Sequence, residues 1–369
     1  MIRLNDFKAE PQALRNEVLG AMQRVLDSGH YVLGPEVTAF ESAWAQRTGA
    51  DHCVGVANGL EAIEIGLRAL GIGPGDEVIT TSMTAVATVL AILNAGATPV
   101  LADIDPSTAL LDPASVERCL SPRTKAVLVV HLYGQMRDIA MWQNFCSAHS
   151  ILLLEDCAQS HDAQDAGLFA GTAGEFGAYS FYPTKNLGAL GDAGALITGN
   201  SALASTARQL RNYGQSTRYV HDIVGTNSRL DELQAAILLV RMQWLAGFTA
   251  RRREIASRYH EEVESGAVEL LAAPAASENH VYHLFVVRTS DRDRFRAHLE
   301  SAQIETLIHY PIPVHQQVPM KGLRLDPQGM SHTEAHAALC VSIPGAPHLT
   351  DDQVSQVISA VNSFRAHNA

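Results

Sequence analysis

The sequence predicts an α/β protein: a mostly parallel sheet with helices on both faces, followed by a smaller α+β domain. Two observations support this fold class. Short continuous apolar runs alternate with stretches of helical periodicity over the first two thirds of the chain, which is typical of parallel strands buried on both faces. From about residue 250 the pattern changes to a mixture of helix and strand signals, and 369 residues are enough for two domains.

The elements of the first part follow in order. Helices are expected at 11–28 and 35–47, where apolar side chains recur at helical spacing. The expected strands are the apolar runs 53–57, 77–81, 98–102, 126–130 and 151–154. Helical stretches between them include 60–70 and 85–95. The Gly-rich turn at 71–76 precedes a strand and lacks the Gly-x-Gly-x-x-Gly spacing, so no dinucleotide site is predicted.

A long helix expected at 229–246 leads out of the first part. The elements expected beyond it are an Arg-rich helix, a strand at 281–288, a helix at 291–302 and a final helix at 351–365. The predicted division is therefore a large domain of residues 1–245 and a small C-terminal domain of residues 246–369.

Composition narrows the class of function. Apolar residues make up 47% of the chain and charged residues 18%, as in soluble globular proteins. No apolar run is expected to span a bilayer and the N-terminus shows no signal pattern, so the expected compartment is the cytoplasm, without a membrane partner. A formal net charge of −12 without a basic stripe argues against nucleic-acid binding. Five cysteines, never spaced as Cys-x-x-Cys, predict reduced buried thiols and no metal site.

The stretch 179–195 holds a single lysine, Lys185, between an aromatic-rich run and a glycine-dense loop. Glycine lets the backbone pass close to a ligand without steric cost. A lysine desolvated in such a place has a lowered pKa, and its amine becomes a nucleophile for carbonyl groups. A surface lysine in a turn is the alternative interpretation of this stretch.

Three further motifs are compatible with the same ligand. Asp156 follows an apolar strand, where open α/β sheets bind ligands, and it could pair with a protonated ring nitrogen or cap a helix. Asn58 and Gly59 join a strand to a helix whose N–H groups could bind phosphate, or they form a simple turn. Asn227 and Arg229 could donate to an anion, or Asn227 could cap the following helix.

Taken in order, these motifs resemble the DegT/DnrJ/EryC1/StrS family of sugar aminotransferases, which depend on pyridoxal 5′-phosphate and have the aspartate-aminotransferase fold (fold type I). The segments that carry the resemblance are Asn58-Gly59, Glu155 to Gln159, Ser180 to Lys185, Gly191 to Gly194 and Asn227 to Arg229. It extends over nearly the whole chain. The resemblance implies a mostly parallel seven-stranded sheet and a small α+β C-terminal domain.

The resemblance also implies catalytic roles. Lys185 would bind the cofactor covalently and then move protons between the substrate carbon and the cofactor. Asp156 would keep the pyridine nitrogen protonated, so that the ring accepts electrons. Gln159 would lie beside the cofactor's ring hydroxyl.

The phosphate of the cofactor would be held by Ser180 and by the N–H groups of Gly59 and Leu60. The family residue matching Asn227 reaches this phosphate from the partner subunit, so the resemblance implies a homodimer with two shared active sites. Family members usually have Ser-Gly-Thr at Asn58-Gly59-Leu60, so a hydroxyl contact to phosphate is lost here.

A second departure concerns the cover of the cofactor ring. The family usually has an aromatic residue in a Thr-aromatic-x-Ala-Thr pattern, and this chain has Ala85 at that place. Aromatic stacking contributes about 1 kcal/mol. Cofactor affinity is therefore expected to be lower, unless Met83 or another side chain covers the ring.

The segment from His309 to His315 resembles the His-Tyr-Pro-x-Pro segment of members that aminate C3 of nucleotide-linked 3-keto sugars. It follows a strand expected to run to about residue 308. His309, Tyr310, His315 and Arg229 are the predicted substrate ligands, as donors to sugar hydroxyls or to a pyrophosphate.

The predicted reaction is the transamination of a nucleotide-linked 3-keto sugar with L-glutamate as amino donor. The resemblance places it in the biosynthesis of an amino sugar for a surface glycan or a secondary metabolite. A 4-keto sugar nucleotide is the alternative substrate. A non-catalytic regulatory role on the same fold is a further alternative, disfavoured because Lys185 and Asp156 are both present.

Overall fold

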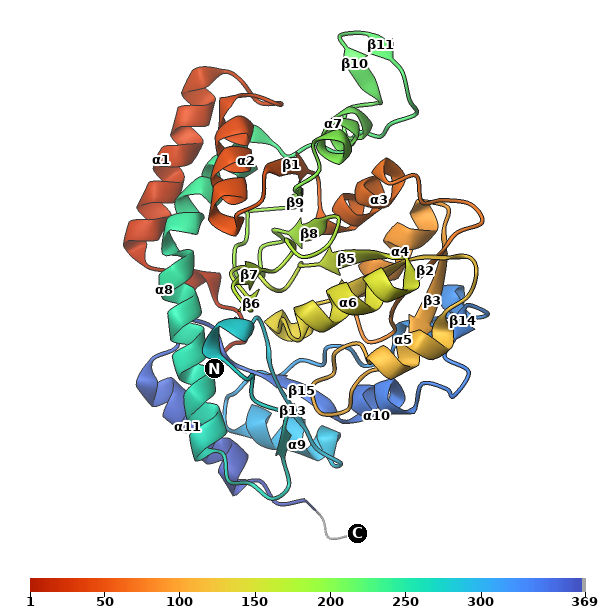
Figure 1. Cartoon of the computed structure of the whole chain (residues 1–369). Helices are drawn as coiled ribbons and strands as arrows, with labels where there is room; N and C mark the ends of the chain where they lie inside the picture. The colour runs from red at the N-terminus through yellow and green to blue at the C-terminus, as the bar shows by residue number, and fades with distance from the viewer. Residues whose placement is uncertain (367–369) are drawn as a thin grey trace.

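A mixed sheet of eight strands forms the centre of the computed structural model, which describes residues 1–366 (Figure 1). The strand order is β1-β9-β8-β5-β4-β2-β3-β14. These strands are β1 (His52–Val56), β2 (Glu77–Thr81), β3 (Thr98–Ala102), β4 (Thr124–Val130), β5 (Leu152–Asp156), β8 (Gly177–Ser180), β9 (Gly194–Thr198) and β14 (Arg324–Leu325). Strand β9 is antiparallel to both neighbours, and the other pairs are parallel. The mostly parallel sheet is confirmed.

The predicted number of seven strands is wrong by one. Seven strands of this sheet come from the first part of the chain, and β14 from the C-terminal third adds an eighth. Its two residues pair in parallel with Val100 and Leu101 of β3. The added strand could not be read from the sequence because two residues carry no periodicity.

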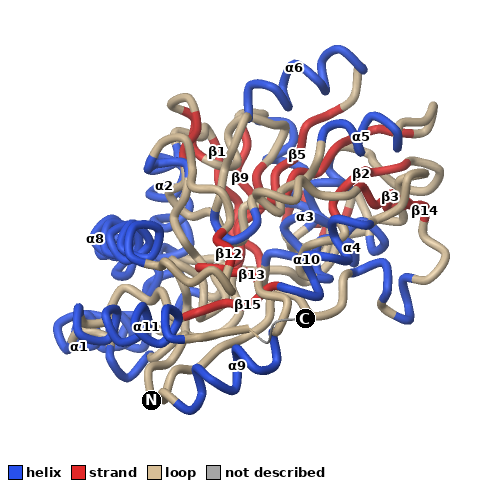
Figure 2. The backbone as a smooth tube through the Cα atoms, turned by 90° about the horizontal axis from the view of Figure 1, so that it is seen from below, coloured by secondary structure: helices blue, strands red, loops and turns tan. Residues whose placement is uncertain are grey.

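Helices cover both faces of this sheet, as predicted (Figure 2). The helices of this part of the chain are α1 (Gln12–Ser28), which does not pack on the sheet, α2 (Pro35–Thr48), α3 (Gly59–Ala69), α4 (Val86–Asn94), α5 (Pro113–Cys119), α6 (Ile139–His149) and α7 (Ser201–Leu210). Strand β4 shows the arrangement clearly: Ala126 and Leu128 pack in a cluster with α3, α4 and α7. Val127 and Val129 point to the other face and pack with α2, α5 and α6. Continuous apolar strands are therefore buried on both sides.

The C-terminal third builds a smaller antiparallel sheet with its own core. Its strands are β12 (Glu269–Leu270), β13 (Phe285–Arg288) and β15 (Cys340–Ile343), in the order β12-β13-β15. Its helices are α9 (Arg292–Ser301), α10 (Ser331–Leu339) and α11 (Asp351–Ser363). The predicted strand reaching residue 308 is not formed; Leu307 and Ser342 make only an isolated bridge. Phe295, Leu299 and Val357 are among the side chains of this second core.

Helix α8 (Glu232–Glu262) joins the two parts without a break, so the Arg-rich helix expected after residue 250 is its second half. Ala235 and Leu238 near its start pack in the core of the large sheet, whereas Ile255 and Tyr259 near its end pack in the C-terminal core. The predicted division at residue 245 falls inside this helix and stays a prediction.

Helix α8 also corrects one expectation about membranes. Among the described residues it is the one helix long and apolar enough to span a bilayer by length and composition, whereas no such run was expected. Its apolar side chains, however, lie in the cores described above, as in the central helix of a globular protein.

Two short hairpins complete the strands. They are β6 (Gln164–Asp165) with β7 (Leu168–Phe169), and β10 (Gln215–Thr217) with β11 (Val220–His221). The β10–β11 hairpin projects from the body of the molecule (Figure 1). All five cysteines are free and buried, as predicted.

Candidate active site

Lys185 lies in a turn just after β8, at the sheet edge where the parallel strands have their carboxyl ends. Its backbone N–H donates to the carbonyl of Tyr182 at 2.8 Å, which closes the turn. Burial lowers the pKa of its amine to about 8, and the negative charge of Asp156 offsets part of this effect. A pKa near neutrality leaves a substantial fraction of neutral amine, which is the nucleophilic form.

Asp156 ends β5 and is held from two sides. Its Oδ2 accepts a hydrogen bond from the Thr88 hydroxyl at 2.8 Å, and its Oδ1 accepts one from the backbone N–H of Ala158 at 3.1 Å. Burial raises the pKa of this carboxyl group, while those hydrogen bonds and the charge of Lys185 lower it. A buried carboxylate with fixed oxygens suits a cationic ring nitrogen.

Thr88 is a residue of the site that sequence reasoning missed. Its hydroxyl also bonds that of Thr84 at 2.9 Å, so the first turn of α4 is linked to Asp156. The available signal was the position of both threonines directly after β2, a strand that ends at the same sheet edge as β5.

The predicted phosphate ligands are brought together by two close backbone approaches. Asn58 caps α3 by accepting from the N–H of Glu61 at 2.9 Å. A Cβ on Gly59 would lie 2.7 Å from the Cβ of Ser180, and a Cβ on Gly194 would lie 2.3 Å from the carbonyl carbon of Asn58. Only glycine therefore lets β8 and β9 approach the start of α3 this closely, which sets Ser180 beside a helix N-terminus suited to an anion.

Gln159 is locked in one orientation. Its Oε1 accepts from the backbone N–H of Tyr133 at 2.6 Å, and its Nε2 donates to the Tyr310 hydroxyl at 3.2 Å. Tyr310 belongs to the C-terminal third, so this contact brings a predicted substrate ligand next to a predicted cofactor ligand.

Three imidazoles lie within electrostatic reach of Lys185: His161, His283 and His309. Burial is the largest cause that lowers each pKa, to about 3 for His161 and about 4 for His309, and the charge of Lys185 adds to it. All three are therefore neutral at pH 7. His161 and His283 were missed, because isolated histidines carry no pattern that marks a site.

His315 is hydrogen-bonded through both ring nitrogens. Its Nδ1 bonds the Ser82 hydroxyl at 2.7 Å and its Nε2 bonds Glu334 at 3.1 Å. His315 therefore joins the loop after β2 to α10, and its role as a sugar ligand stays a prediction.

Asn227 and Arg229 lie in the segment that directly precedes α8. Asn227 is exposed and forms a backbone bridge with Asn212. The Arg229 guanidinium donates to Asn212 Oδ1 at 3.2 Å and lies 5.4 Å from the centre of the Tyr213 ring. The roles of both residues as ligands stay predictions.

Ala85, at the start of α4, is half-buried. Met83 does not replace the missing aromatic residue, because it is fully buried in an apolar cluster with Ile104 and Leu132. Its side chain therefore belongs to the core and is not open to a ligand.

Among residues 1–366 one group has the spacing of metal ligands: His131, Glu155 and Cys157. The Glu155 carboxylate, however, is bonded by His131 at 2.9 Å and accepts from the N–H groups of Gly171, Ala173 and Gly174 at 2.8 to 3.0 Å. Burial raises the pKa of the Cys157 thiol well above its ordinary value, which favours the protonated form. These groups form a hydrogen-bonded network and do not present a preformed ligand set.

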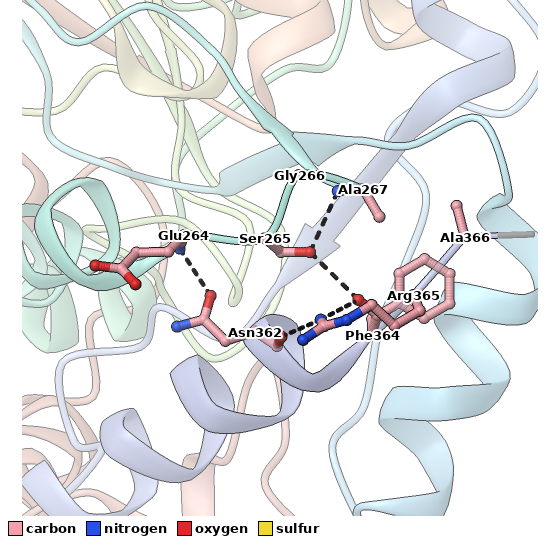
Figure 3. A pocket seen from close by; sticks show the side chains of 8 residues that line it. All are labelled: Glu264, Ser265, Gly266, Ala267, Asn362, Phe364, Arg365 and Ala366. Carbon is pink, nitrogen blue, oxygen red and sulfur yellow. Dashed lines mark hydrogen bonds between the residues drawn. The ribbon is translucent and has the colours of Figure 1, made fainter. Parts of the chain in front are cut away.

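A separate hollow of about 820 Å³ lies near the end of α11 (Figure 3). It is lined by Glu264, Ser265, Gly266, Ala267, Asn362, Phe364, Arg365 and Ala366. Its polar groups bond one another, for example the N–H of Glu264 with Asn362 Oδ1 at 2.8 Å. No residue of the Lys185 site lines it, and it is not part of the candidate active site.

Residues 12–362 match the model of the DegT/DnrJ/EryC1/StrS aminotransferase family. The chain belongs to this family. It is 43% identical to the dTDP-3-amino-3,4,6-trideoxy-alpha-D-glucose transaminase of Streptomyces venezuelae, over 97% of this chain and 95% of that one. It is also 43% identical to the dTDP-3-amino-3,6-dideoxy-alpha-D-galactopyranose transaminase of Aneurinibacillus thermoaerophilus, over 99% of both chains.

The crystal structure of S. venezuelae DesV with a ketimine intermediate is similar to this aminotransferase, with a TM-score of 0.94, 43% identity and 98% coverage of both chains. The fold type I assignment and the dependence on pyridoxal phosphate are thereby confirmed. The residues described above fit that cofactor. A helix N-terminus suited to an anion, a buried carboxyl group and an amine of lowered pKa lie at one sheet edge, and these are the groups that a phosphorylated pyridine aldehyde requires.

Proposed function

We propose that this aminotransferase transfers the amino group of L-glutamate to C3 of a nucleotide-linked 3-keto sugar. The observation that carries the proposal is that Lys185, in the turn after β8, lies within electrostatic reach of the buried carboxyl group of Asp156 at the end of β5. The C3 position is supported by the relatives from S. venezuelae and A. thermoaerophilus, both named for 3-amino sugars. The product would be an amino sugar for a surface glycan or a secondary metabolite.

Pyridoxal phosphate supplies an electron sink for the carbanion that forms at the amine-bearing carbon. Lys185 then serves as the base and acid that moves the proton, because its pKa of about 8 lies near physiological pH. Asp156 keeps a positive charge on the ring nitrogen, with Thr88 and Ala158 fixing its oxygens. Gln159, Ser180 and the first N–H groups of α3, at Gly59 and Leu60, orient the cofactor.

His309 is the best-placed sugar ligand of the predicted set. Its Nδ1 bonds the Ser342 hydroxyl at 2.8 Å, and no residue among 1–366 pairs with its Nε2. That nitrogen therefore remains for a sugar hydroxyl. Arg229 is proposed for the pyrophosphate, from the neighbouring subunit.

We further infer a homodimer with shared active sites, located in the cytoplasm. Large apolar side chains are exposed in the loop before α2 and in or just after the β10–β11 hairpin: Tyr31, Val32, Tyr219, Val220 and Val224. Such a set suits a protein interface. The exposed Asn227 lies close by in the chain and would reach the partner's phosphate site.

The test has two stages. Purified protein with pyridoxal phosphate is expected to show a visible band that shifts on adding L-glutamate and is absent in Lys185→Ala. A missing band in the unmodified protein would point to a regulatory protein and overturn the enzyme assignment. In the second stage, 3-keto and 4-keto nucleotide sugars are offered with glutamate and the amine is located by NMR. Amination at C4 would overturn the C3 proposal alone.

A further inference from the structure

Tyr310 makes a contact that a sugar ligand does not require. It accepts a hydrogen bond from Gln159 Nε2 at 3.2 Å. The orientation of Gln159 is fixed, because the backbone N–H of Tyr133 can only donate and therefore holds Oε1. The Tyr310 oxygen is thus an acceptor in this bond, and its own proton is left for a second partner.

The surroundings of Tyr310 place its hydroxyl on the cofactor side. Burial and the charge of Asp156 both raise the pKa of this phenol, to about 12, and the bond from Gln159 opposes them. Its ring packs against the apolar cluster that contains Met83, two residues before Ala85. The ring of His309 meets it edge-on, with centroids 5.6 Å apart. The Tyr310 hydroxyl therefore lies in contact with Gln159 and within electrostatic reach of Asp156.

We propose that Tyr310 is a cofactor ligand, whose hydroxyl donates to the ring oxygen of pyridoxal phosphate beside Gln159. The inference rests on the proposed function only through the identity of the cofactor. An ionised ring oxygen accepts two donors, and hydrogen bonds to a charged oxygen are stronger than neutral ones. Because Ala85 offers no aromatic surface, contacts in the plane of the ring contribute a larger share of cofactor binding in this chain.

The test compares Tyr310→Phe with the unmodified protein and with Tyr259→Phe. Tyr259 is a matched control, since its buried hydroxyl donates to the Pro344 carbonyl at 2.6 Å in the C-terminal core. Tyr310→Phe is expected to raise the Kd for pyridoxal phosphate about tenfold, while Tyr259→Phe leaves it unchanged. Without substrate, the pH midpoint of the visible band should shift upward in Tyr310→Phe, because the ring oxygen then keeps more negative charge.

A cofactor analogue isolates the contact. With 3-deoxypyridoxal 5′-phosphate, which lacks the ring oxygen, the unmodified protein and Tyr310→Phe are expected to bind equally, within about twofold. If Tyr310→Phe does not fold, Tyr310→Gln enters the same comparison. An unchanged Kd and an unchanged pH midpoint, with only the KM for the sugar raised, would overturn the inference and make Tyr310 a sugar ligand. Failure of the proposed function is distinct, since the visible band would then be absent from the unmodified protein.

Discussion

The floor of the active site and the projecting rim of the molecule are built in opposite ways. The floor, formed by Asp156, Gln159, Ser180 and Lys185, lies at strand ends and is held by bonds within one chain. The rim, residues 213–224 with the β10–β11 hairpin, leaves Tyr219 78% and Val224 85% exposed. The bonds that hold the floor therefore form within a single chain, whereas the rim exposes apolar surface that the proposed homodimer would bury.

The strongest test of the floor is Lys185→Ala. The transfer rate should fall at least about 10³-fold, because the base and the covalent attachment are lost together. The rate and the visible band are measured with glutamate and a 3-keto nucleotide sugar. Lys125→Ala, which removes an exposed lysine of β4, is the control and should behave as the unmodified protein. A retained band in Lys185→Ala would refute its role.

The rim is tested by the double substitution Tyr219→Asp and Val224→Asp. Charges buried at an apolar interface are costly, so the dimer dissociation constant should rise by about 100-fold or more. Sedimentation equilibrium measures the constant, and circular dichroism checks that each subunit stays folded. Leu19→Asp on the exposed side of α1 is the control. An intact dimer in the double variant would show that the rim is not the interface.

The lowered pKa of Lys185 predicts that the rate of cofactor uptake depends on pH. The amine of Lys185 is reactive only when neutral, and burial lowers its pKa from the ordinary 10.5 to about 8. Uptake of pyridoxal phosphate by the apoprotein should accelerate about tenfold per pH unit below pH 8 and level off above it. Stopped-flow absorbance gives the profile. A rise that continues to pH 10 would mean that the lysine is fully hydrated.

The smallest effect is expected for Thr88, whose hydroxyl donates a hydrogen bond to Asp156 of the floor. Thr88→Val removes the hydroxyl bonded to Asp156 and should weaken cofactor binding about fivefold, the effect of one hydrogen bond. Thr88→Ser keeps the hydroxyl and should restore the affinity. Equal Kd values for the Val and Ser variants would show that methyl packing, and not the hydrogen bond, is what Thr88 contributes.

Prediction from sequence succeeded where local pattern and strand topology agree. The strand end placed Asp156 where open α/β sheets bind ligands. The family resemblance predicted that Lys185, distant in the chain, serves the same cofactor, and the roles of both residues stay predictions. The structure places Lys185 within electrostatic reach of Asp156. Prediction from sequence did not find the contacts of His315, whose partners Ser82 and Glu334 lie in other elements. It gave Thr88 no role, although this threonine ends the pattern around Ala85, because the bond from its hydroxyl to Asp156 joins segments far apart in the chain.

The sequence by itself determined the fold class and the family, because apolar periodicity and motif order are properties of the chain. It also predicted the roles of Lys185 and Asp156. Only the tertiary structure decided which polar atoms are already paired. In the folded chain His315 is bonded to Glu334, and Gln159 is bonded to both Tyr133 and Tyr310. The fold also adds β14 to the large sheet. The physical reason is that hydrogen bonds and burial depend on distances between segments far apart in the chain, and no local pattern encodes those distances.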